Sequence, residues 1–99
     1  MPEMYKEIAR KSQENIEDLE KKLQNDPNNL DSLQEMAVAL YGKGDIATSF
    51  DLLLKSIEKD KEWNDQAARK QLIEFFMSAG FDASETINAR RKLASLLFS

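Results

Sequence analysis

Apolar residues recur every three or four positions along nearly the whole chain, and no stretch alternates apolar and polar residues as a surface strand would. Turn signals interrupt this pattern, and they predict helices over about residues 2–24, 29–41, 46–59, 66–79 and 82–98. Because the connections are short, consecutive helices should pack antiparallel. The pattern therefore predicts an all-α fold of about five helices. The length of 99 residues corresponds to one domain.

The residue types that are missing exclude several kinds of chemistry. The chain contains no Cys and no His, so it offers no thiolate, no imidazole base and neither of these metal ligands. We therefore expect no metal, no cofactor and no enzymatic activity. The net charge of −4 argues against binding to nucleic acid. No apolar run approaches membrane-spanning length, and the first residues lack the features of a signal peptide, so we expect a cytoplasmic protein with no membrane contact.

One pair of helices carries a repeat signal. Asp26 and Asp60 lie 34 residues apart, and each follows the end of a helix. Counting Leu30 as the first position, small residues occupy positions 8, 15, 20 and 27, namely Ala37, Gly44, Ser49 and Ser56. This spacing resembles the tetratricopeptide repeat, a right-handed array of helical hairpins in which small residues let paired helices approach. Leu33 and Leu40 depart from the family, which favours Trp and Tyr there. The resemblance implies a structural role for Ala37, Gly44 and Ser49.

The repeat spacing also predicts how the chain is organised. Residues 28–61 form the best repeat, residues 1–25 correspond to part of a preceding unit, and residues 64–98 correspond to a degenerate capping pair. Arrays of this kind bury a continuous core when about three units stack. We therefore expect the chain to belong to a longer protein.

The C-terminal part resembles a narrower family, the chaperedoxins. The matching residues are Asp60, Asp65, Ala67, Ala68, Arg69, Lys70, Leu72, Phe76, Gly80, Arg90, Arg91, Leu93, Ala94 and Leu97. Members of that family carry an N-terminal thioredoxin-fold domain, which is missing from this chain, and a C-terminal tetratricopeptide domain. The resemblance implies a non-catalytic domain of a thioredoxin-like co-chaperone that binds proteins or peptides, such as unfolded clients or a chaperonin. The alternative is a structural or oligomerisation domain with no transient ligand.

The first helix of the repeat carries one candidate binding site. In the tetratricopeptide family this helix lines the peptide groove, which places Gln34, Val38 and Tyr41 on the binding face. Some members bind a C-terminal carboxylate through Lys and Asn, but Gln34 and Val38 occupy those positions here. We therefore expect a weak groove for an apolar or basic peptide segment.

A second candidate site lies at the C-terminus, where Leu96, Leu97 and Phe98 follow the basic residues Arg90 and Arg91. Two interpretations remain open for Phe98. The favoured one is that its ring folds back onto Phe75 or Phe76 and closes the core. In the other, it is an exposed anchor for a large chaperone-type partner, with the basic residues steering the encounter.

Two further residues have structural interpretations. Trp63 precedes the fourth helix and should pack beneath it. Arg69, with Arg90 or Arg91, should bond to carboxylates such as Asp60 or Asp65 and so lock the last hairpin. The alternative is that these arginines bind an acidic partner.

Overall fold

The computed structural model describes residues 15–98, and these form a layered array of helices with no strand among them. Residues 15–25 are helical and are followed by α2 (Leu30–Lys43), α3 (Ile46–Lys59), α4 (Trp63–Ala79) and α5 (Ser84–Phe98). The all-α prediction is confirmed. The start of the expected first helix lies outside the described residues. Helix α5 begins two residues later than its pattern predicts.

The hairpin of α2 and α3 is defined by the polar residues at its ends. The Asn29 side chain accepts a hydrogen bond from the backbone N–H of Ser32 at 3.1 Å and caps α2. Gly44 ends α2 with φ of 99°, a left-handed conformation that favours glycine. The side chain of Asp45 then accepts a hydrogen bond from the N–H of Thr48 and caps α3. Gly44 and Asp45 lie between the two helices, so they fix where the chain reverses direction.

The close packing of α2 on α3 depends on small side chains. Ala37 and Ser49 are fully buried, and the Ser49 hydroxyl donates a hydrogen bond of 2.6 Å to the carbonyl oxygen of Ala37. A larger residue at either position would hold the helices apart. Ser56, at position 27 of the repeat, is also fully buried.

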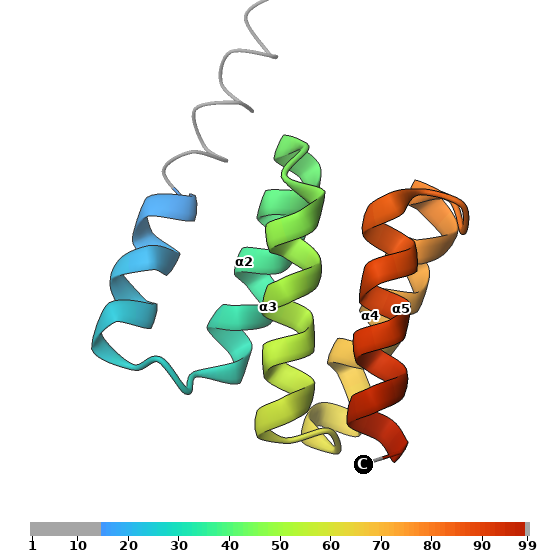
Figure 1. Cartoon of the computed structure of the whole chain (residues 1–99). Coiled ribbons are helices and arrows are strands. Elements are labelled where there is room, and N and C mark those ends of the chain that lie inside the picture. Colours follow the sequence, from blue (N-terminus) through green and yellow to red (C-terminus); the bar gives the residue numbers. More distant parts are fainter. Residues whose placement is uncertain (1–14, 99) are drawn as a thin grey trace, which may run out of the picture.

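Helix α3 lies at the centre of the array and contacts α2, α4 and α5 (Figure 1). The main core gathers side chains from all four of these helices: Ala37, Phe50, Leu53, Leu54, Ile57, Ala68, Leu72, Phe76, Ala89 and Leu93. A second cluster attaches residues 15–25 to the other side of α2 and consists of Ile16, Leu19, Met36 and Leu40. Helix α2 is therefore packed on both sides, as in a stacked array.

The start of α4 departs from regular helix geometry. Asn64, Asp65 and Gln66 have φ values of 50°, 56° and 62°, which are left-handed, and right-handed helix follows them. Asn and Asp tolerate this conformation better than most residues. Trp63 opens the segment half-buried, and its backbone N–H donates to the carbonyl oxygen of Asp60. The sequence predicts a fourth helix from residue 66, and the right-handed part of α4 begins one residue later, at Ala67.

Candidate functional site

The predicted groove residues of α2 lie where α2 meets α4. The side-chain nitrogen Nε2 of Gln34 donates a hydrogen bond of 3.3 Å to the carbonyl oxygen of Ala67. The ring of Tyr41 stacks on that of Phe75, with centroids 3.9 Å apart and an angle of 5° between the planes. Both contacts join residues more than thirty positions apart in the chain. These contacts hold α2 and α4 together, so that residues of both helices form one continuous surface.

The stacked pair belongs to a larger aromatic cluster. Phe50 of α3 lies 6.3 Å from Tyr41 and 6.4 Å from Phe75, measured between ring centroids, and Phe76 meets Phe50 edge-on at 5.2 Å. Such offset and edge-on pairs are favourable beyond the area they bury. Tyr41 is half-buried in this cluster, so one part of the side chain fixes α4 while the remainder reaches the surface.

The surface beside this contact is mildly apolar and acidic. Val38 is 45% exposed, and Asp31 and Glu35 lie seven and three positions before it, on the same face of the helix. Neither carboxylate pairs with a cation among residues 15–98. We call this surface the α2–α4 face and define it by Asp31, Gln34, Glu35, Val38, Tyr41 and Phe75.

Sequence reasoning placed Tyr41 on the binding face but did not identify Phe75. The sequence does contain the information needed to find Phe75, because this residue lies 34 positions after Tyr41 and so occupies the same position in the next repeat unit. Extending the repeat spacing to α4 would have identified it as the aromatic partner.

The C-terminal candidate residues divide into two environments. Leu96 and Leu97 are half-buried and pack against the main core. Phe98 is 87% exposed, so the expectation that it folds back onto Phe75 or Phe76 is wrong. Phe98 lies about 140° around the helix from the buried Leu93, five residues earlier, and therefore faces away from the core.

The basic residues of α5 also have separate roles. The Arg90 guanidinium lies 5.6 Å from the centroid of the Phe81 ring, within the range of a cation–π contact. Lys92 pairs with Asp51 of α3 at 3.6 Å, and Arg91 is exposed. The predicted carboxylate partners of Arg90 and Arg91 do not occur among the described residues.

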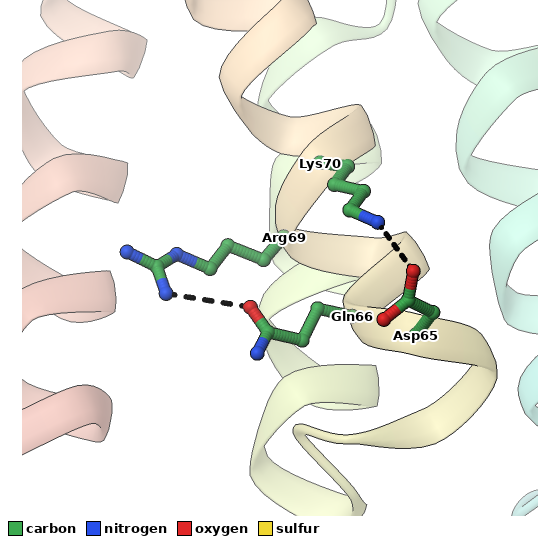
Figure 2. A network of polar contacts seen from close by, with 4 residues as sticks. All are labelled: Asp65, Gln66, Arg69 and Lys70. Atoms are coloured by element: carbon green, nitrogen blue, oxygen red, sulfur yellow. Dashed lines mark hydrogen bonds and ion pairs between the residues drawn. The ribbon is translucent and has the colours of Figure 1, made fainter.

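The predicted bond of Arg69 to Asp60 or Asp65 is likewise wrong. Figure 2 shows the arrangement found: Asp65 pairs with Lys70 at 2.8 Å, while Nη1 of Arg69 donates to Oε1 of Gln66 at 3.5 Å. The left-handed turn carries the Asp65 side chain toward Lys70 and away from Arg69. The hydrogen bond from Lys70 and its positive charge lower the pKa of Asp65 below the ordinary value.

The two groups of candidate residues lie on different helices and do not form one site. Gln34, Val38 and Tyr41 belong to α2, whereas Arg90, Arg91 and Leu96 to Phe98 belong to α5, and α3 contacts both helices. The two sites must therefore be considered independently.

Within residues 15–98, no group of three or more acidic side chains lies close enough to hold a metal ion. The same residues include no helix with the length and apolar character needed to cross a bilayer. What both sites offer is apolar surface bordered by charge, which is suited to binding another molecule.

Comparison with known proteins gives one finding. The model of the family described as "Tetratricopeptide repeat" matches residues 9–98, which is most of the chain. No curated protein and no solved structure gives a significant match.

Proposed function

The chain belongs to the tetratricopeptide repeat family, and from this premise we propose that its α2–α4 face binds an apolar, basic segment of a partner protein. Domains of this family generally mediate contacts between proteins and are typically non-catalytic. The observation that carries the proposal is the exposed Val38, which lies between the aromatic pair of Tyr41 and Phe75 and the carboxylates of Asp31 and Glu35. Within residues 15–98 these two carboxylates have no cationic partner.

Each part of this face contributes a different kind of recognition. Val38 and the exposed part of Tyr41 give a small apolar surface, which favours the burial of an apolar side chain. Asp31 and Glu35 attract a basic segment and disfavour an acidic one. The Tyr41–Phe75 stack and the Gln34–Ala67 hydrogen bond hold the surface rigid, so little entropy is lost in forming it on binding.

The repeat boundaries form part of the proposal. Residues 28–61 act as the central repeat, and the burial of Ala37, Ser49 and Ser56 supports this division. Residues 1–25 belong to a preceding unit and residues 64–98 to a capping pair. On this division the α2–α4 face spans two consecutive units.

The wider role that we propose comes from the resemblance of residues 60–97 to chaperedoxins. On that basis the chain is the C-terminal part of a cytoplasmic, thioredoxin-like co-chaperone. Its α2–α4 face holds unfolded clients while the thioredoxin-fold domain of the parent protein acts on them. The sequence of the parent protein tests this role, because a thioredoxin-fold domain upstream is required.

A second candidate function involves α5, and the exposure of Phe98 favours it. An exposed aromatic residue near the basic Arg90 and Arg91 is the kind of anchor by which a helix docks on a large partner such as a chaperonin. A Phe98→Ser variant should melt as the parent does but lose binding to purified chaperonin. Retained binding would exclude this docking role. Self-association that Phe98→Ser abolishes would instead support the oligomerisation alternative.

Chemical shift mapping tests the α2–α4 face directly. Addition of an unfolded apolar peptide with Lys and Arg residues should first shift the amide signals of Gln34, Val38 and Tyr41. A peptide of the same apolar content with Glu in place of Lys and Arg should bind more weakly. Shifts confined to α3 and α5 would contradict the proposed site.

A further inference from the structure

A pocket separate from the α2–α4 face opens between the C-terminal end of α3, the start of α4 and the C-terminal end of α5. Its volume is about 260 Å³, and its apolar walls are Ile57, Leu97 and Phe98. Sites for drug-sized ligands have volumes of about 300–1,000 Å³. This pocket is smaller and matches a ligand of one or two amino acid residues.

Positive charge exceeds negative charge in the lining of this pocket. Lys61 and Arg69 contribute two cations, against the single carboxylate of Glu62. Neither cation forms an ion pair with a described residue. A carboxylate ligand would therefore meet a favourable potential without first having to displace an ion-pair partner among residues 15–98.

Arg69 is the most informative residue of the pocket. It is half-buried, and among the described residues its guanidinium makes one long hydrogen bond of 3.5 Å, to Gln66. The group carries five N–H donors arranged to match a carboxylate. Figure 2 shows its side chain extending away from the Asp65–Lys70 pair, and Leu97 and Phe98 of α5 line the same pocket.

We propose that this pocket binds a carboxylate attached to an apolar group, with Arg69 holding the carboxylate and Ile57, Leu97 and Phe98 receiving the apolar group. Either the C-terminal residues of a polypeptide or a small free organic acid carries this chemistry. The exposed ring of Phe98 lies at the rim, where it can cover a bound apolar side chain. The site does not depend on the α2–α4 face.

Titration of the chain with three probes, followed by NMR, tests this assignment. N-acetyl-Leu-Leu with a free carboxylate should shift the signals of Ile57, Leu97 and Phe98, and its C-terminal amide should bind at least fivefold more weakly. The third probe, 4-methylpentanoate, separates the sources. Equal binding by 4-methylpentanoate and the dipeptide acid supports a small organic acid, whereas weaker binding supports a polypeptide terminus.

Two matched variants remove one positive charge each. Arg69→Gln should weaken binding of the dipeptide acid at least fivefold, whereas Lys22→Gln, at an exposed position outside the pocket, should leave it within twofold of the parent. Arg69→Lys keeps the charge and should retain part of the binding. Retained binding in Arg69→Lys would show that position 69 tolerates substitution without loss of the fold. Equal affinity for acid and amide, no effect of Arg69→Gln or no binding at millimolar concentration would overturn the assignment. Each of these results leaves the α2–α4 face and its basic peptide untouched.

Discussion

At the scale of single residues, Ala37 determines how closely α2 approaches α3. It is fully buried, and its carbonyl oxygen accepts the hydrogen bond from Ser49. Ala37→Leu should lower the free energy of unfolding by about 1–3 kcal/mol, because the extra side chain overpacks this contact. Urea denaturation measures the change, with Ala47→Leu at an exposed position of α3 as the control. Unchanged stability would contradict the close packing of the hairpin.

The two buried serines of the repeat, Ser49 and Ser56, should differ in how replacement by alanine changes the free energy of unfolding. The Ser49 hydroxyl donates to the carbonyl oxygen of Ala37, whereas the Ser56 hydroxyl is buried without a hydrogen-bond partner among the described residues. Ser49→Ala should therefore cost about 0.5–1.5 kcal/mol of unfolding free energy, and Ser56→Ala should be neutral or stabilising. Denaturation of both variants under the same conditions gives the comparison. A greater loss for Ser56→Ala would refute this assignment of partners.

At the scale of an element, the end of α2 depends on two glycines with different conformations. Gly44 has a positive φ, whereas Gly42 lies within the helix, with open space around the position of a Cβ atom. Gly44→Ala should destabilise the chain by about 1–2 kcal/mol because of left-handed strain. Gly42→Ala should stabilise it by about 0.5–1 kcal/mol because alanine favours the helix. Thermal melts that shift in the same direction would contradict this description of the α2 C-terminus.

The left-handed turn at the start of α4 should be detectable in the titration of Asp65. Lys70 lowers the pKa of this carboxyl in the folded state, so the pair stabilises the fold at pH values above the unfolded pKa. That stabilisation is lost as the pH falls through the folded pKa. NMR should give Asp65 a pKa below its ordinary value, and Lys70→Gln should raise it, whereas Lys55→Gln on α3 should not. An ordinary pKa for Asp65 in the parent chain would exclude the pair.

At the scale of the whole molecule, the repeat spacing predicted the helices and the small residues of the α2–α3 hairpin, because each depends on local pattern. Gly44 and Asp45, for example, mark the turn through their own conformational preferences. The partners of Tyr41 and Gln34 depend on how α4 docks on α2, which the pattern of α2 alone does not contain. Asp65 pairs with Lys70 and not with the expected Arg69, because residues 64–66 are left-handed. The spacing of residues along the sequence does not predict this local conformation.

The central claim is that the α2–α4 face binds an apolar, basic peptide segment, and a matched pair of variants tests it most directly. Val38 and Ile87 are both β-branched, lie on helices and are 45% and 40% exposed, but only Val38 belongs to this face. Replacement of either by Lys adds the same charge to a similarly exposed position. The account predicts that Val38→Lys weakens binding of the unfolded basic peptide about tenfold, as measured by calorimetry, whereas Ile87→Lys changes the Kd by less than twofold. Equal effects of the two substitutions, or a greater effect of Ile87→Lys, would contradict it.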